Sequence, residues 1–458
     1  MTTSSTALQQ LAVQAQGISL KYVPKLVLTQ AKLCILDTIG CILAGSRAEE
    51  ALLMLHCEPG SGSISASVLG TAQRRSVQEA IRINAYLGDV LELNDLIGGH
   101  ASIGNVTTVL ALGEATGATG GQMLEAVVRG IEITTRVYES VYPSLRRYTE
   151  AGLVPVGIPS TFGTAAAAAH LLQLNVSQTT NALAIAGSLA GWCPAEVIFG
   201  NGGSVKPMLF GAQPGDVGVT AAYYAKAGMT GPHQLLDSPV GYFSTASTQG
   251  LFNADAWSDR WALMQPRRKL HACCGYLHSP VDALEALHKA LGADVLGTAH
   301  IQVNVAPYVA DVVSKDRLPN SANDSRFHLQ YCLALVICGA SVILPEHSIA
   351  FEEQLQRADI QQAMGRIQVV PDATLDHYHH CRVDVITSAG AKHTKVLTGS
   401  RGSPQAPLTD AEVIEKFLLL ATPVLGLENT MAVIEHVMSI EDLTNPRDLF
   451  DLLKQESS

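Results

Sequence analysis

The spacing of apolar residues changes twice along this chain, and these changes restrict the folds open to it. From the start to about residue 265, apolar residues recur at helical spacing between breaks of Gly, Pro and Ser. After Pro266, β-branched residues alternate in HIQVNV, RIQVV and CRVDVI, which is typical of strands. Helical spacing returns after SRGSPQAPLTD. The sequence therefore predicts a helical unit formed by 1–265 and 402–458, and an α+β unit formed by 266–401.

The length of the chain agrees with two units. A single hydrophobic core rarely grows beyond about 250–300 residues, and this chain has 458. We expect the C-terminal helices to pack back on the helical unit. The fold class is thus mainly α with a smaller α+β domain. In that smaller domain we expect one mixed or antiparallel sheet from HIQVNVAPYVADVV, RIQVVPDATL and CRVDVITSAGAKHTKVL, with helices at SPVDALEALHKALG and RFHLQYCLALVICGA.

Charge and composition limit the partners and the location. With a net charge of -11, the protein is not expected to bind nucleic acid or an anionic membrane, because both need a basic surface. Nine cysteines without a secretory signal at MTTSSTALQQLAVQAQG favour free thiols in the cytoplasm. The most membrane-like segment, KLVLTQAKLCILDTIGCILAGS, carries Lys32 and Asp37. Charges inside a bilayer are costly, so we expect a buried helix there.

One stretch, RRKLHACCGYLHSP at 267–280, combines three cations with two imidazoles and two thiols. Structural zinc sites usually need a second ligand pair, which is not evident, and adjacent cysteines are not a C-x-x-C redox motif. The cysteines can also be small core residues ahead of a helix that starts near Ser279. Clustered cations without an acidic residue between them favour contact with an anion. The side chains of metal-ligand type are His271, Cys273, Cys274 and His278.

Two other stretches carry candidate polar groups. In LNDLIGGHASIG, Asp95 and His100 flank a Gly-rich turn ahead of a helix, whose N-terminus would favour a carboxylate ligand. Alternatively, Asp95 caps locally and His100 lies at the surface. In FGNGGSVKPMLFGAQ, Lys206 follows a Gly-rich loop and precedes an apolar helix, a place where the helix dipole does not favour a cation.

The order of several motifs resembles the MmgE/PrpD family over nearly the whole chain. That family includes 2-methylcitrate dehydratase, cis-aconitate decarboxylase and iminodisuccinate epimerase. The resemblance implies a helical domain, an α+β lid domain and a cleft between them. It also implies a homodimer, and chemistry on small di- or tricarboxylates without a metal or an organic cofactor. The motifs are LCILDTIGCILAGS, IGNVTTVLALGEATGATGGQMLEAVVRGIEI, STFGTAAAAAHLLQL, SVKPMLFGA, KLHACCGYLH and RFHLQYCLAL.

The resemblance also implies roles for single residues. Lys206 matches the family's active-site lysine, Lys269 the lysine that opens the lid motif, and His100 the histidine of the first loop. His278 matches the histidine that closes the lid motif. Cys274 falls where the decarboxylase has a histidine and the epimerase-like members have a cysteine.

The chain departs from the family pattern at other positions. The acidic signature NGxxAHxLDFDD appears here as NAYLGDVLELND, so that Asp89 replaces the histidine, while Glu92 and Asn94 replace aspartates. Val154 replaces a histidine of the second loop, and Val313 aligns near a tyrosine of the decarboxylase. We expect the loss at Val154 to make the site more apolar and to suit a substrate that bears an alkyl group or lacks one carboxylate.

These residues predict a cofactor-independent lyase of the 2-methylcitrate dehydratase type, acting on a citrate-like or alkylcitrate acid. Fixed cations would stabilise charge next to a carboxylate, while a neutral imidazole or amine moves the proton. The alternatives are an epimerase or isomerase, a decarboxylase, and a catalytically inactive relative that binds a carboxylate. The predicted catalytic residues are His100, Lys206, Cys274 and His271, and the predicted substrate-binding residues are Glu92, Asp95, Lys269, Arg268 and His278.

Overall fold

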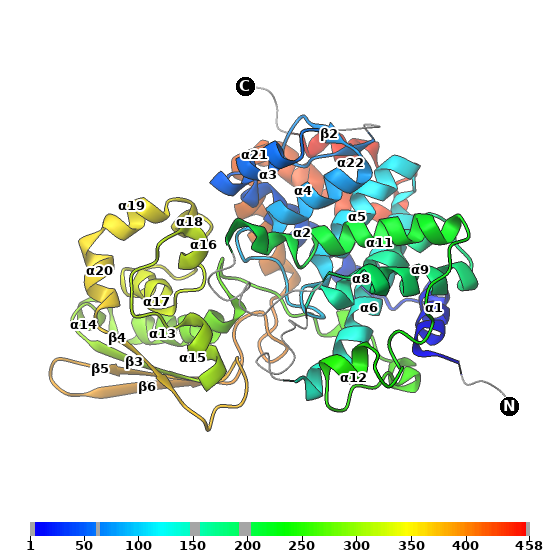
Figure 1. The fold of residues 1–458 in the computed structure, drawn as a ribbon. Coiled ribbons are helices and arrows are strands. Elements are labelled where there is room, and N and C mark those ends of the chain that lie inside the picture. Colours follow the sequence, from blue (N-terminus) through cyan, green and yellow to red (C-terminus); the bar gives the residue numbers. More distant parts are fainter. Residues whose placement is uncertain (1–4, 61–64, 147–155, 192–202, 455–458) are drawn as a thin grey trace.

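The computed structural model describes residues 5–60, 65–146, 156–191 and 203–454. Figure 1 shows two bodies, a larger one of helices and a smaller one in which helices cover a sheet. The first and last segments of the chain lie together in the larger body, which we call the helical domain, and the middle forms the smaller body, which we call the lid. The predicted fold class, mainly α with a smaller α+β part, is confirmed.

Most of the helical domain comes from the first half of the chain. Several of its helices begin with a capping box, in which a Ser, Thr or Asn side chain and a Glu or Gln three residues later satisfy free backbone N–H groups. The described helices are α1 (Ala7–Gly17), α2 (Lys25–Gly45), α3 (Glu49–Cys57), α4 (Val77–Asp89), α5 (Ala101–Thr116), α6 (Gly120–Glu139), α8 (Ile158–Leu171), α9 (Val176–Leu189), α11 (Ala212–Lys226) and α12 (Tyr242–Ala246), with a short hairpin of β1 (Ala66–Ser67) and β2 (Arg74–Arg75).

Small residues let these helices approach closely. A Cβ atom at Gly163 of α8 would lie 1.9 Å from Oγ1 of Thr134 and 2.3 Å from the carbonyl oxygen of Gly130, both on α6. The run Ala165–Ala169 of α8 is fully buried. The low aromatic content of 5% therefore reflects a core filled by close backbone contact rather than by large rings.

The C-terminal helices return to the helical domain, as predicted. Helix α21 (Asp410–Met438) packs along α2 and bends at Gly426, whose φ is 74°, and α22 (Arg447–Leu452) follows it. The two charges inside α2 are paired with this part of the chain. Nζ of Lys416 lies 2.7 Å from Oδ1 of Asp37, and Nζ of Lys32 lies 2.5 Å from Oε1 of Glu441.

Helices α2 and α21 are both long and apolar enough to cross a membrane by length and composition alone. Helix α2 is mostly buried, as expected from the sequence, and its interior charges Lys32 and Asp37 are paired within the helical domain. Only 33% of the most apolar part of α21 is buried. Its outer face exposes Leu419, Leu427 and Met431.

The lid is built on a four-stranded mixed sheet in the order β4-β3-β5-β6. Strands β3 and β4 are parallel, with Ile301 opposite Ile367, and the other neighbours are antiparallel. Helix α13 packs on β5 and β6, while α15 and α17 pack on β4. The strands are β3 (His300–Val305), β4 (Ile367–Pro371), β5 (Cys381–Ile386) and β6 (Lys392–Leu397); the helices are α13 (His278–Leu291), α14 (Ala293–Leu296), α15 (Pro307–Val313), α16 (Ala322–Ser325), α17 (Leu329–Ile337), α18 (Glu346–Ile349), α19 (Phe351–Gln356) and α20 (Ala358–Met364).

One predicted strand was wrong in its second half. The segment PYVADVV has a β-like composition but forms α15, because Pro307 is the first residue of that helix and its fixed φ suits a helix start. The two segments that join the domains lie side by side, since the backbone N–H of Arg268 donates to the carbonyl of Gly402 at 2.8 Å.

Candidate active site

Two buried lysines from different parts of the chain meet at one carboxylate. Lys206 lies in a short 3-10 helix, η2 (Gly203–Met208), and Lys269 lies in the segment that leads into the lid. Nζ of Lys269 is 2.9 Å from Oε2 of Glu92, and Nζ of Lys206 contacts Oε1 of the same carboxylate. The exposed fractions of the two lysines are 1% and 0%. The pair thus holds a carboxylate between two ammonium groups. We call Lys206, Lys269, Glu92 and Asp89 the lysine cluster.

The loop that carries Glu92 has an uncommon backbone. It connects α4 to α5, and both Glu92 and His100 have positive φ angles, 54° and 76°. Such angles cost a non-glycine residue roughly 1–3 kcal/mol. A Cβ atom at Gly99 would lie 2.7 Å from Cγ1 of Val156, so the loop passes too close to its neighbours for a side chain there. The surrounding contacts therefore hold the loop in a conformation that it would not adopt alone.

A line of hydrogen bonds connects His100 to the lysine cluster. Nδ1 of His100 lies 2.5 Å from Oδ1 of Asn94, and Nδ2 of Asn94 donates to Oδ1 of Asp89. Oδ2 of Asp89 accepts from Nζ of Lys206 at 3.0 Å. The imidazole of His100 stacks on the ring of Phe210, with centroids 4.6 Å apart, and Nζ of Lys206 lies 4.7 Å from the centroid of the same ring.

Burial sets the protonation of these groups. Burial lowers the pKa of His100 to about 3, helped by the charge of Lys269, so the imidazole is neutral. Burial also lowers the pKa of Lys206 and of Lys269, while nearby Asp89 opposes both shifts. For Asp89 itself, burial is the largest influence and works to raise the pKa, but the charge and hydrogen bond of Lys206 and the charges of other neighbours together outweigh burial, and the pKa is lowered. The site combines a neutral base with ammonium groups that release a proton more readily than usual.

A third buried lysine, Lys416, connects the chain segments that carry the site. Nζ of Lys416 on α21 donates to the carbonyl of Leu93 at 2.9 Å and to that of Lys269 at 2.7 Å, and it pairs with Asp37. It therefore joins the loop after α4, the segment into the lid, and α2. Lys416 was not selected from the sequence, because its neighbours in EKFLLLA look like an ordinary amphipathic helix. A lysine inside an apolar run was the available signal.

Asp95, predicted to bind substrate, lies against α2. Its Oδ1 accepts from the backbone N–H of Ile97 at 3.3 Å, and the charges of Asp37 and Arg268 act on it. Burial raises the pKa of Asp95 to about 6. The neighbours that act on Asp95 are therefore Asp37 and Arg268 rather than the lysine cluster.

The three consecutive cations of the lid motif do not face one anion. Of the three, only Lys269 reaches the lysine cluster. Arg268 points to α2, where it donates to Oε1 of Gln30 at 2.8 Å, and Arg267 donates to the hydroxyl of Tyr378 at 3.2 Å. An extended backbone sends successive side chains to opposite sides, so the prediction that Arg268 binds substrate does not fit its position.

The two histidines of the same motif are held inside the lid. His271 donates from Nε2 to Oδ1 of Asp282 at 3.0 Å, and its Nδ1 accepts from the backbone N–H of Ile343 at 3.2 Å. Both nitrogens are occupied, which leaves His271 no atom for the predicted catalytic role. His278 lies at the start of α13, with Nε2 3.3 Å from the carbonyl of Cys273, and burial keeps its pKa well below the usual range. We therefore leave both out of the proposed mechanism.

Cys274 lies near the lysine cluster. The charges of Lys269 and Lys206 act on its thiol and favour the thiolate, but burial outweighs them and the pKa is raised. The thiol is therefore protonated and weakly nucleophilic. Val313 lies buried at the end of α15 in the lid core, and Val154 lies outside the described residues.

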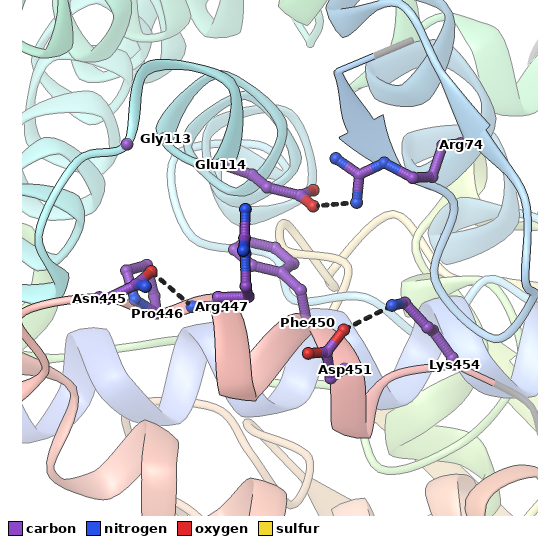
Figure 2. Close-up of a pocket in the computed structure, with 10 residues that line it drawn as sticks. Arg74, Gly113, Glu114, Asn445, Pro446, Arg447, Phe450, Asp451 and Lys454 are labelled. Carbon is purple, nitrogen blue, oxygen red and sulfur yellow. Dashed lines mark hydrogen bonds and ion pairs between the residues drawn. The ribbon is translucent and has the colours of Figure 1, made fainter.

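Other features do not add a second reactive centre. Within the described ranges, no group of three or more His, Cys, Asp and Glu side chains is arranged to hold a metal ion. A cavity of about 420 Å³ lies in the helical domain, between the C-terminal end of α5, β2 and α22. Figure 2 shows that ion pairs occupy its rim, Arg74 with Glu114 and Asp451 with Lys454, with Arg447 between them. The residues lining this cavity include none from the lysine cluster.

Comparison with known proteins connects the chain to a family. The model of the MmgE/PrpD N-terminal domain matches residues 9–254, and that of the C-terminal domain matches residues 271–440. The chain is 25% identical to the cis-aconitate decarboxylase of Homo sapiens, over 98% of this chain and 95% of that protein. It is 26% identical to the cis-aconitate decarboxylase-like protein oryM of Aspergillus oryzae, over 95% and 94%, and 24% identical to the cis-aconitate decarboxylase of Aspergillus terreus, over 96% and 94%. The chain is an enzyme of the MmgE/PrpD family.

Proposed function

We propose that the protein is a lyase that decarboxylates an aconitate- or citrate-like acid. The observation that carries the proposal is the carboxylate of Glu92 held between Lys206 and Lys269. Two ammonium groups that bind one carboxylate of the protein can bind one carboxylate of a substrate in its place. The full-length similarity to cis-aconitate decarboxylases supports decarboxylation over the dehydration predicted from the sequence.

The reaction needs the groups that the site contains. When carbon dioxide leaves, the electron pair of the broken C–C bond stays on the substrate and spreads towards a remaining carboxylate. The fixed charges of Lys206 and Lys269 stabilise that negative charge. A proton must then reach carbon, and an ammonium group whose pKa is lowered by burial is a suitable donor. Water returns the proton to the amine.

Charge balance indicates how the substrate enters. The ammonium groups of Lys206 and Lys269 are already balanced by Asp89 and Glu92. A substrate carboxylate must therefore displace that of Glu92, and each further carboxylate would add uncompensated charge. The expectation of a substrate that bears an alkyl group or lacks one carboxylate stays a prediction, which the panel of acids in the test below addresses.

Dehydration is the second candidate, because the neutral imidazole of His100 favours it. A neutral base can take the proton next to a carboxylate while Lys206 protonates the leaving hydroxyl group. The homodimer, the absence of a cofactor and the cytoplasmic location remain predictions. The exposed apolar face of α21 gives the homodimer a surface to test by light scattering.

The test is proton NMR in deuterated buffer with cis-aconitate, citrate, 2-methylcitrate and succinate-type acids. Decarboxylation releases carbon dioxide and places deuterium at carbon. Dehydration gives an alkene without carbon dioxide, seen as a vinyl proton from citrate or as a shifted methyl signal from 2-methylcitrate, and epimerisation gives deuterium exchange alone. Lys206→Ala should abolish turnover. Lys32→Ala, which removes a lysine that pairs with Glu441 outside the cluster, should retain it. Binding of these acids without turnover would instead support the catalytically inactive relative.

A further inference from the structure

Two positions at which the chain departs from the family pattern are in direct contact. Asp89 and Asn94, which replace a histidine and an aspartate, are hydrogen-bonded to each other and lie between Lys206 and His100. Asp89, Asn94 and Lys206 are each at most 1% exposed, and His100 is 7% exposed. Water therefore does not compete for these hydrogen bonds, and each group must find its partner within the line.

The protonation of Asp89 determines which group donates in each hydrogen bond from Asp89 to His100. Asp89 pairs with Lys206 and is ionised, so its carboxylate only accepts. The amide of Asn94 must then turn Nδ2–H towards Asp89 and Oδ1 towards His100. Since Oδ1 only accepts, Nδ1 of His100 must carry the proton. Nε2 is left with a free lone pair, and it makes no hydrogen bond to any residue that the structure describes.

We propose that Asn94 is a positioning residue that fixes His100 as the Nδ1–H tautomer and so makes Nε2 the proton acceptor of the site. The stacking of the imidazole on Phe210 holds the plane of the ring, while Asn94 sets its protonation. An aspartate at position 94 would place two carboxylates in contact and favour the charged imidazole. The amide keeps the imidazole neutral beside Lys269. The tautomer is a property of the resting protein. Its catalytic use rests on the second candidate under the proposed function, dehydration, in which His100 takes the proton.

The test is nitrogen-15 NMR of the histidine side chains, because the two neutral tautomers give different nitrogen shifts. The spectrum of His100→Gln identifies the His100 signals by their loss. The chain contains two internal references of the opposite tautomer: His271 donates from Nε2 to Asp282, and His233 donates from Nε2 to Oδ1 of Asn181 at 3.0 Å. We expect His100 to be protonated at Nδ1 while both references are protonated at Nε2. Protonation of His100 at Nε2 in the unmodified protein would overturn the proposal.

Two variants test whether Asn94 is the cause. Asn94→Leu has a similar shape but no amide, so it should let the Nε2–H tautomer of His100 appear. Asp89→Asn removes the charge that directs the amide and should also mix the tautomers. In Asn94→Leu, which leaves the charges of the lysine cluster unchanged, kcat should fall roughly tenfold or more with little change in KM. Asp89→Asn should also lower kcat, but because it removes a negative charge beside Lys206, its KM should fall as well. If either variant is folded and His100 remains purely Nδ1–H, Asn94 does not set the tautomer. If no acid is turned over but the tautomers behave as expected, the proposed function fails and this inference stands.

Discussion

Lys416 and Lys206 are both buried lysines near the same loop, yet they are paired in different ways. Lys416 donates to two backbone carbonyls and pairs with Asp37, so its partners belong to the fold. Lys206 contacts the side-chain carboxylates of Asp89 and Glu92. A side chain can turn away and be replaced by a ligand, whereas a backbone carbonyl cannot. The comparison separates a lysine that builds the site from one that can act in it.

The largest expected effect is a loss of stability when Lys416, the structural lysine, is replaced. Lys416→Met leaves the carboxyl group of Asp37 in the core without its ion-pair partner, which should lower the free energy of unfolding by about 3–5 kcal/mol. Chemical denaturation measures the change. Adding Asp37→Leu to the same protein removes the orphaned carboxyl group and should restore a large part of the stability. An unchanged unfolding midpoint in Lys416→Met would mean that the contacts of this lysine with the loop after α4, the segment into the lid and α2 do not stabilise the protein.

Lys269→Met should act mainly on turnover. It removes one of two charges that face the substrate, and losing one such group typically costs about 10²–10³ in kcat. Glu92 keeps its contact with Lys206, so the loss of stability should be smaller than for Lys416→Met. Steady-state kinetics and denaturation on the same preparation check both parts. Equal losses of stability in the two variants would remove the distinction between them.

Asp95 gives a pH-dependent prediction. Its pKa in the folded protein is about 6, above the ordinary value of 3.8. The folded state therefore binds this proton more tightly than the unfolded state, and the resulting stability is present below pH 4 and lost as the pH rises through 6. At pH 7, Asp95→Asn should raise the free energy of unfolding by roughly 2 kcal/mol, and at pH 4 it should change little. Denaturation at the two pH values measures this, and an equal effect at both would contradict it.

The smallest expected effect is a change in KM when Glu92, whose carboxylate a substrate would displace, is replaced. Glu92→Gln leaves the two lysines short of one negative charge, so KM for a small dicarboxylate should fall by roughly fivefold, or about 1 kcal/mol. Glu132→Gln is the matched control, since Glu132 is also buried and pairs with Arg136 at 3.0 Å, outside the cluster. That control should lose stability without any gain in anion affinity. A higher KM in Glu92→Gln would show that Glu92 helps to bind substrate.

The sequence predicted the arrangement of the fold better than the directions of side chains. Apolar spacing indicated the helices and the sheet, because burial imposes a period of 3.6 or 2 on every element. It failed at α15, where Pro307 at the start of a helix outweighed a β-like composition. The error was local because a proline at a helix start decides only the element that follows it.

The site was harder to predict, since its groups converge from distant positions. The resemblance brought Lys206, Lys269 and His100 forward, and the structure places all three in one cluster or beside it. The composition of the stretch 267–280 brought forward His271, only two residues from Lys269, but His271 faces into the lid instead. The chain bends at residues 271–273, so the alternation of an extended segment does not continue from Lys269 to His271. Lys416 touches Lys269 from 147 residues away, and no motif records such a contact.

The hydrogen bond between Arg268 and Gly402 has a consequence for how such an enzyme can arise. The two ends of the lid lie one hydrogen bond apart, and a Cβ atom at Gly402 would come within 2.1 Å of the carbonyl oxygen of Arg268. A segment whose ends meet can be inserted into an existing domain without pulling that domain apart. A single gene insertion between α12 and α21 would therefore have supplied the lid and, on its first residues, the second lysine of the active site.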